Sequence, residues 1–548
     1  MELSSPGISK KTDTIKTDNT IPVIVGVTGH RIVRKEDYGA IYAAVKKELE
    51  KLQNSCPNSR IILLSSLAEG GDMLCAEAAA ELNIPLFAVL PTEKDVYEKD
   101  FSNEAKERLE FHCSRAEQLF VAPFTEKVPE EGISRAYRFR QAGIYVAAHC
   151  HVLLALWDGG PGTAAACGTA ETVDFALNGN YQPDRGAALS ADGSNAVIQI
   201  FPPRGERTEE TAGTVHVLGD SEALWKILQE TDEFNRLAAD AKPGTKSRLP
   251  ADNCEDALLV RMEKTGLTAG SLSTLYAKKY RLILALLAVA SALLTFAFLM
   301  YDEAQAIWMI LVCGLMLIAA WTFQRYASRS DCHRRYLEYR ALAESLRVQT
   351  YLRYAGSRVE AADLLSWTQR EETAWITAAL RALTAGRLSD EQQDIRICWV
   401  EEQRSYHQET GKRAQHRIVV SERIVHIAFA LSIALYCAAL VFELLCGGLI
   451  FTPLIRISDV EIVRTFLKIV LGTISAVTLF TANFYGRLSL PRTFSDHEKM
   501  ERFYGRMSAL LLQYGQTEDL LTALAREELI ENGNWVSYQR DNKPDISI

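Results

Sequence analysis

Two apolar runs separated by a short polar break constrain the fold of this chain more than any other feature. Leu282–Met300 and Ala306–Phe323 contain no charged residue, and the acidic segment Tyr301–Gln305 lies between them. Because a membrane-spanning helix needs about 20 mostly apolar residues, the runs predict a transmembrane helical hairpin with a short outer loop. A buried hairpin in a large soluble core is the alternative, and the length of the charge-free runs favours the membrane.

A second pair of apolar segments, Ile424–Phe442 and Phe466–Phe484, predicts a second hairpin. Basic residues flank both hairpins where the chain enters and leaves them: Lys278, Lys279, Arg281, Arg325, Arg329, Arg334, Arg335, Arg417, Arg423, Arg487 and Arg492. Because cytoplasmic flanks carry the excess of Lys and Arg, we expect a multi-pass protein of the cell inner membrane. Both termini and the bulk domains would then be cytoplasmic.

Small and polar residues recur every third position in the fourth apolar segment, at Gly472, Ser475 and Thr478. Such a stripe either lets helices pack closely or lines an aqueous path, and we expect packing.

Composition excludes several classes of protein. The net charge of −9 argues against a nucleic-acid partner. The eleven cysteines are scattered without a C-x-x-C pair, so neither a disulfide framework nor a zinc ribbon is indicated. Residues Met1–Thr20 are polar, lack the apolar segment of a signal peptide, and predict a disordered lead-in.

Residues 21–235 predict an α/β domain, a Rossmann-like parallel sheet covered by helices. Helices are expected at Glu36–Leu52, Asp72–Leu82 and Ser134–His149. The predicted strands are Val23–Val27, Ile61–Ser65, Leu86–Leu90, Gln118–Val121, Val152–Trp157 and Ala196–Phe201. We expect the last of these to complete the sheet.

Polar and glycine-rich loops follow four of these strands. In open parallel sheets ligands bind beyond the carboxyl ends of the strands, where loop amides and helix N-termini hold anions. One such loop alone is more typical of a turn, so the prediction of a site rests on all four. For Arg138, on a predicted helix, a solvated surface and a phosphate clamp fit equally well. The candidate ligand contacts are Thr28, Gly29, His30, Arg31, Ser66, Glu69, Gly70, Gly71, Asp72, Pro91, Thr92, Arg138, Asp158, Gly159, Gly168 and Thr169.

The cluster His149-Cys150-His151 has only a superficial likeness to a metal site. Consecutive residues at a helix-to-strand junction point in different directions, so we expect neither a bound metal nor a resident cofactor.

Five segments together resemble the SLOG superfamily of Rossmann-like nucleotide-sensor domains, over about residues 20–235. They are GVTGHR at Gly26–Arg31, SSLAEGGD at Ser65–Asp72, LPT at Leu90–Thr92, ALWDG at Ala155–Gly159 and GTAE at Gly168–Glu171. The resemblance implies a nucleotide or a nucleotide-derived second messenger as the ligand.

The superfamily includes the lonely-guy phosphoribohydrolases, whose fingerprint is a PGGxGTxxE loop. This chain departs from it through the insertion Thr163–Cys167 and through Glu171, which follows Thr169 by two positions instead of three. The resemblance therefore implies binding more than hydrolysis. The alternative is a membrane-anchored nucleotide hydrolase, an N-glycosidase or phosphoribohydrolase, with Glu171 or Glu69 as the catalytic carboxylate. A scaffold with a degenerate site is a third interpretation.

The rest of the chain is expected to be helical, with a linker helix in 236–281 and cytoplasmic helical regions at 324–423 and 485–548. HRRYLEYRALAESLR at His333–Arg347 and REELIENGNWVSYQR at Arg526–Arg540 resemble SLATT-type membrane domains, which accompany SLOG sensors in bacterial conflict systems. The resemblance implies an oligomeric, pore-forming effector of antiphage defence. That family has one hairpin, so the second implies a duplication or a fused variant.

Overall fold

The computed structural model describes residues 19–123, 134–161, 168–179, 196–204, 210–242, 256–302, 307–387, 392–447, 459–487 and 490–541. Residues 1–18 of the predicted lead-in, the insertion at 163–167 and residues 303–305 of the predicted break between the first two apolar runs lie outside the described residues.

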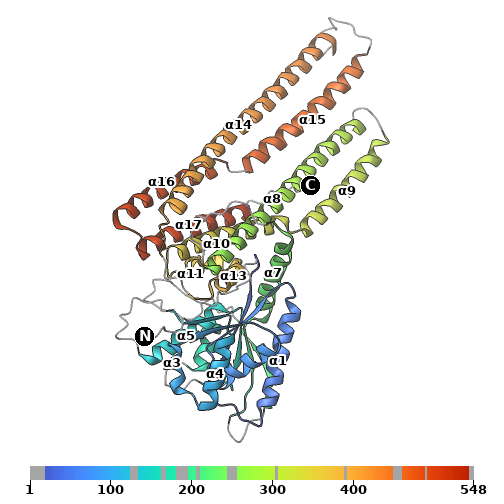
Figure 1. Cartoon of the computed structure of the whole chain (residues 1–548). Helices are drawn as coiled ribbons and strands as arrows, with labels where there is room; N and C mark the ends of the chain where they lie inside the picture. The colour runs from blue at the N-terminus through green and yellow to red at the C-terminus, as the bar shows by residue number, and fades with distance from the viewer. Residues whose placement is uncertain are drawn as a thin grey trace. The chain divides into compact units, whose positions relative to one another are not determined.

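The chain divides into two compact units whose segments alternate along the sequence (Figure 1). The first unit consists of Met1–Leu272, Glu338–Ile395 and Gln516–Asn534, and the second of Ser273–Leu337, Arg396–Gly515 and Trp535–Ile548. Three helices, α8 (Ala257–Asp302), α10 (Cys332–Tyr354) and α17 (Glu518–Asp541), contribute residues to both units.

A seven-stranded sheet forms the centre of the first unit, in the order β4-β3-β2-β1-β5-β6-β7. Its first six strands are parallel. The sequences of these strands are nearly continuous apolar runs, because helices cover both faces of the sheet and the side chains on each face are buried. The strands are β1 (Val23–Gly29), β2 (Ile61–Ser65), β3 (Leu86–Leu90), β4 (Gln118–Val121), β5 (Val152–Leu156), β6 (Ala196–Ile200) and β7 (Val215–Leu218).

The prediction that the strand at Ala196–Phe201 completes the sheet is wrong, because the structure adds one further strand, β7, beyond it. β7 pairs antiparallel with β6, with Ile200 opposite Val215 and Val197 opposite Leu218. The sequence does not reveal β7 because it is a short edge strand whose side chains are exposed or only half-buried. Its residues therefore lack the apolar run that marks the buried strands.

Helices pack on both faces of the sheet. On one face α1, α2, α4 and α7 share a core with alternate residues of the strands, whereas α5 packs against the other face, where Val146 and Cys150 lie next to Gly26. The helices that lie wholly in the first unit are α1 (Tyr38–Ser55), α2 (Gly71–Glu81), α3 (Lys94–Tyr97), η1 (Glu98–Asp100), α4 (Asn103–Arg115), α5 (Arg135–His149), α6 (Thr169–Asn178), α7 (Ser221–Asp240), α11 (Ala361–Leu364), α12 (Trp367–Glu372) and α13 (Ala374–Thr384).

A buried ionic cluster joins the sheet domain to the helices that follow α10 within the first unit. His149 at the end of α5 places Nε2 2.9 Å from Oε1 of Glu360, and Arg381 on α13 lies 3.5 Å from the other carboxylate oxygen. Burial opposes ionisation of Glu360, but the charges of His149 and Arg381 outweigh it and hold its pKa well below the ordinary value of 4.5.

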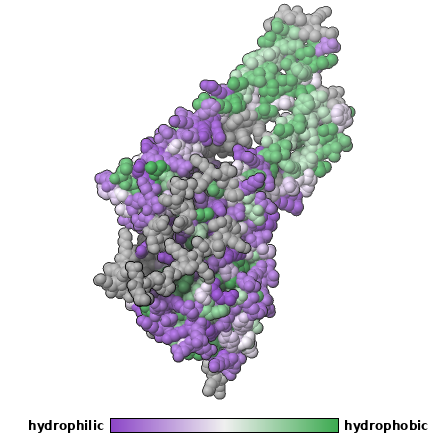
Figure 2. Space-filling view, viewed as in Figure 1, coloured by the Kyte–Doolittle hydropathy of each residue, from purple (hydrophilic) through white to green (hydrophobic). Residues whose placement is uncertain are grey.

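The second unit contains the apolar helices. Four helices in the described residues are long and apolar enough to span a membrane, and 12% or less of the most apolar stretch of each is buried. Figure 2 shows hydrophobic residues covering these spans and hydrophilic residues covering most of the visible remaining surface. Besides the shared helices α8, α10 and α17, this unit contains α9 (Met309–Arg329), η4 (Arg396–Glu401), α14 (Glu402–Phe442), η5 (Glu443–Gly447), α15 (Val460–Arg487) and α16 (Leu490–Tyr514).

The small and polar stripe on α15 faces other helices of the second unit. The Thr478 hydroxyl lies 3.1 Å from that of Ser432 on α14, and Ser475 Oγ lies 3.3 Å from the Tyr436 hydroxyl. A Cβ atom at Gly472 would lie 2.9 Å from a methyl group of Leu299. These contacts are those of helix packing, as the spacing of the stripe predicts.

Glu360→Gln should destabilise the full-length protein in detergent by about 2 kcal/mol at neutral pH, because it removes the charged partner of His149 and one of the two carboxylates, with Asp363, that lie beside Arg381. The native stabilisation is present above the unfolded pKa of about 4.5 and is lost as pH falls below it, so wild type and variant should converge in acid. Chemical unfolding at several pH values measures the difference. Glu233→Gln removes an exposed i,i+3 pair with Arg236 and should change stability by less than about 1 kcal/mol; equal effects of the two substitutions would contradict the prediction.

Candidate functional site

A pocket of about 330 Å³ lies at the carboxyl ends of the parallel strands. β1 lies between β2 and β5, so the strand order reverses here, and such a switch point is where open α/β sheets bind ligands. Nine of the residues predicted from the sequence line the pocket: Thr28, Gly29, His30, Arg31, Ser66, Asp72, Pro91, Gly168 and Thr169. The four loops therefore converge on one site, as the parallel fold predicts.

Glycines let the first two loops touch. A Cβ atom on Gly29 would lie 2.9 Å from the Cα of Gly71, and a Cβ atom on Gly71 would lie 2.9 Å from the Cα of Gly29. Gly70 has φ +96°, and a Cβ there would lie 2.2 Å from the carbonyl oxygen of Arg31. The Gly71 N–H donates to the His30 carbonyl at 2.9 Å. Gly70 and Gly71 thus bring the loops together and do not themselves line the pocket.

Asp72 secures the same junction from inside the first turn of α2. Its Oδ2 accepts a hydrogen bond from the Ala68 N–H at 3.3 Å. Burial raises the pKa of Asp72 to about 7, although hydrogen bonds from the N–H groups of Ala68 and Gly29 favour the charged form. The carboxyl group is therefore committed to holding the loops, and its charge changes near neutral pH.

His30 and Asp158 meet just beyond the carboxyl ends of the paired strands β1 and β5. Nε2 of His30 lies 3.0 Å from Oδ1 of Asp158, and the Gly160 N–H donates to the same oxygen at 3.0 Å. NH1 of Arg204 lies 3.7 Å from Oδ2. Burial opposes ionisation of Asp158, but these donors hold its pKa below the ordinary value of 3.8.

Several lining residues escape prediction from the sequence. Tyr97 and Phe139, whose ring centroids are 5.7 Å apart, add an aromatic wall. Arg204 follows β6 and adds a cation. No local motif marks these residues. Only the position of β6 beside β5 could have indicated that the segment after it reaches the site.

The structure places some predicted site residues outside the pocket lining. These are Glu69, Gly70, Gly71, Thr92, Arg138, Asp158, Gly159 and Glu171. The two proposed catalytic carboxylates have other contacts: Oε1 of Glu171 lies 2.9 Å from Nε of Arg140, and Glu69 accepts a hydrogen bond from the Ser102 hydroxyl at 2.7 Å.

Helix N-termini make the pocket suitable for an anion. α2 begins at Gly71 and α6 at Thr169, beside lining residues of the pocket. The first N–H groups of a helix lack partners within the helix, and its dipole favours negative charge there. Together with Arg31 and Arg204, these termini favour an anionic group such as a phosphate.

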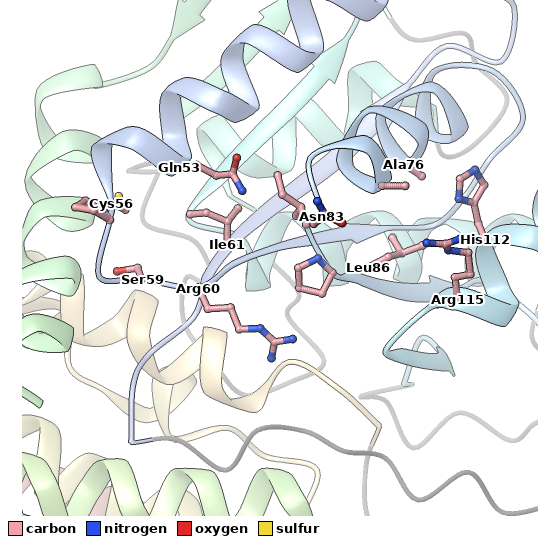
Figure 3. Close-up of a pocket in the computed structure, with 14 residues that line it drawn as sticks. Gln53, Cys56, Ser59, Arg60, Ile61, Ala76, Asn83, Leu86, His112 and Arg115 are labelled. Carbon is pink, nitrogen blue, oxygen red and sulfur yellow. The ribbon is translucent and has the colours of Figure 1, made fainter. Parts of the chain in front are cut away.

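A larger hollow of about 580 Å³ lies at the opposite, amino edge of the sheet (Figure 3). Its lining includes Arg60, His112 and Arg115, and α1, α2 and α4 all end near it. Helix C-termini carry partial negative charge, which the two arginines offset, whereas burial lowers the pKa of His112 below 6.5 and favours its neutral form. Arg60 also forms an ion pair with Glu117, with NH1 and Oε1 3.0 Å apart. Electrostatics therefore favours the smaller pocket as the anion site.

The His149-Cys150-His151 cluster has structural contacts. His149 bonds to Glu360, while Nδ1 of His151 accepts from the Ile24 N–H at 3.1 Å. Among the described residues no three His, Cys, Asp or Glu side chains gather in a way that could hold a metal ion.

No protein-family model matches this chain, and no curated protein is significantly similar to it in sequence. The resemblance to sensor and effector families therefore stays a prediction.

Gly70→Ala should destabilise the full-length protein by about 1–3 kcal/mol, because alanine is strained at positive φ and its Cβ would meet the Arg31 carbonyl. Gly39→Ala is the control: Gly39 lies in α1 and its Cβ would meet no atom within 4 Å. Alanine there should stabilise by up to about 1 kcal/mol. Thermal unfolding in detergent measures both, and a harmless Gly70→Ala would show that the loops do not need this close approach.

Proposed function

We propose that this chain is a membrane effector in which the sheet domain binds a nucleotide-derived anion and thereby changes the state of the membrane-spanning helices. The observation that carries the proposal is the pocket of about 330 Å³ at the switch point, whose lining includes the N-terminus of α6, the first turn of α2, and Arg31 and Arg204. Small-molecule sites in proteins begin at about this size.

Nucleotides combine the features that this pocket accommodates. A phosphate suits the helix N-termini and Arg204, and a planar base suits the aromatic pair Tyr97 and Phe139. The prediction of a nucleotide ligand from the loop motifs and the physical character of the pocket point in the same direction.

The link to the membrane is the helix α8. It is continuous over 46 residues and includes both a buried part in the first unit and the first candidate span. Arg261, Met262 and Thr265 in its first part are buried. A ligand that binds one packing of this part better than another would bias the span that continues it. Permeabilisation of the bacterial inner membrane by an oligomer, as a defence response, is the outcome that we propose.

Binding without turnover is favoured over hydrolysis. Glu171 is held by Arg140 and Glu69 by Ser102, and neither carboxylate lines the pocket. A general acid or base must reach the reacting group within about 3 Å or through one water.

The full-length protein in lipid vesicles tests the proposal against AMP, ADP, ATP, NAD, ADP-ribose, cyclic mononucleotides and cyclic dinucleotides. We expect at least one compound to raise the melting temperature, to release an entrapped dye, and to be recovered unchanged. Arg204→Gln should weaken its binding by about tenfold, the scale of a charged hydrogen bond. Arg115→Gln, in the hollow at the other edge of the sheet, should leave binding unchanged.

Three results would contradict the proposal. They are a panel without any stabilising compound, binding that depends on Arg115 instead of Arg204, and a stabilising compound that is consumed. The last result would instead establish the hydrolase alternative.

A further inference from the structure

We propose that His30 accepts a hydrogen bond from a hydroxyl group of the bound ligand and so selects ligands with an intact ribose. Asp158 acts as its positioning residue. The inference rests on the proposed binding of a nucleotide, and it names the chemical group that one side chain recognises.

The main chain fixes His30 independently of its side chain. Its N–H donates to the carbonyl of Leu156 at 3.1 Å, and its own carbonyl accepts from the Gly71 N–H at 2.9 Å. The imidazole lines the pocket and is 13% exposed. A change of side chain therefore alters the pocket wall without removing these main-chain bonds.

The contact with Asp158 determines which ring nitrogen carries the proton. An ionised carboxylate can only accept, so the nitrogen 3.0 Å from its Oδ1 must donate, and the proton is on Nε2. The Asp158 N–H also points at Nε2 from 3.3 Å, a contact in which Nε2 would be the acceptor. An unprotonated Nε2 would nevertheless turn its lone pair toward a negatively charged oxygen, which is the less favourable arrangement.

The second ring nitrogen is then an acceptor. Burial lowers the pKa of His30 below 6.5, more than the hydrogen bond to Asp158 raises it, and the charge of Arg204 lowers it further. The ring is therefore neutral at pH 7, and Nδ1 has a lone pair. In the part of the chain that the structure describes, hydrogen bonds reach His30 only at its main chain and at Nε2.

Nδ1 differs from most polar groups of this pocket, because it accepts a hydrogen bond and they donate hydrogen bonds. Arg31, Arg204 and the helix N-termini offer N–H groups, which suit phosphate oxygens. The carboxyl group of Asp72 is buried and accepts hydrogen bonds from the N–H groups of Ala68 and Gly29. Apart from the hydroxyl groups of the lining, which can both donate and accept, Nδ1 of His30 is thus a ring acceptor in a pocket rich in donors.

The position of Arg204 identifies that donor as a sugar hydroxyl. Arg204 and His30 contact the two oxygens of one carboxylate, Oδ2 and Oδ1 of Asp158. A phosphate held by Arg204 would place the group bonded to it next to His30. In a nucleotide that group is the ribose, whereas the amino group of the base lies at the far end of the molecule.

Binding of AMP, ADP and ADP-ribose to the full-length protein in detergent tests the inference, each beside its 2′-deoxy and 3′-deoxy counterpart. Wild type should prefer the ribonucleotide over at least one counterpart by about five- to tenfold, the effect of one neutral hydrogen bond. His30→Ala should bind both forms equally and at the affinity of the deoxy compound. His30→Gln, which retains an acceptor oxygen, should keep part of the preference. Asp158→Ala should lose it, because the ring is no longer held.

His216→Ala is the control, because His216 lies on the exposed edge strand β7 and contacts Glu210. It should keep the full preference. The inference is overturned if wild type binds ribonucleotides and both deoxy series equally, or if His30→Ala still discriminates. Failure of wild type to bind any of the compounds would instead overturn the proposed nucleotide binding, and the inference with it.

Discussion

The parallel pairing of β1 with β5 is the interaction on which the site depends. In its register Thr28 lies opposite Ala155 and Gly29 opposite Leu156. Because both strands end at this level, the residues that follow them, His30 and Asp158, come within hydrogen-bonding distance. Two segments more than a hundred residues apart in sequence thus form one wall of the pocket, and the sheet supplies its geometry before any ligand binds.

Helix polarity explains why only one edge of the sheet suits an anion. In a parallel α/β unit every crossover helix starts near the carboxyl ends of the strands and ends near the amino ends. The smaller pocket therefore has helix N-termini beside it, whereas the larger hollow has helix C-termini and the cations that offset them. The size of a cavity therefore does not decide whether it suits an anion. The orientation of the helix dipoles around it does.

Buried strands and apolar helices could be predicted from the sequence because both are long apolar runs. β7 could not, because an exposed edge strand leaves no such pattern. For the site, the four loops were predictable, since parallel strands end at one edge. The roles of single residues were not predictable. Gly70 allows the close contact between two loops, and Glu171 pairs with Arg140. Arg204 lines the pocket from a segment that contains no recognisable motif. These outcomes depend on tertiary contacts that local patterns do not encode.

The alternation of the two units along the chain has a consequence for biosynthesis. The segment Gln516–Asn534 belongs to the first unit, where Glu528 pairs with Arg347 and Leu529 accepts a hydrogen bond from Gln369. The ribosome completes this segment only after all four apolar helices have been made. A nascent chain therefore cannot complete its first unit before all four apolar helices have left the ribosome, so the order of translation makes the apolar helices available before the first unit is whole.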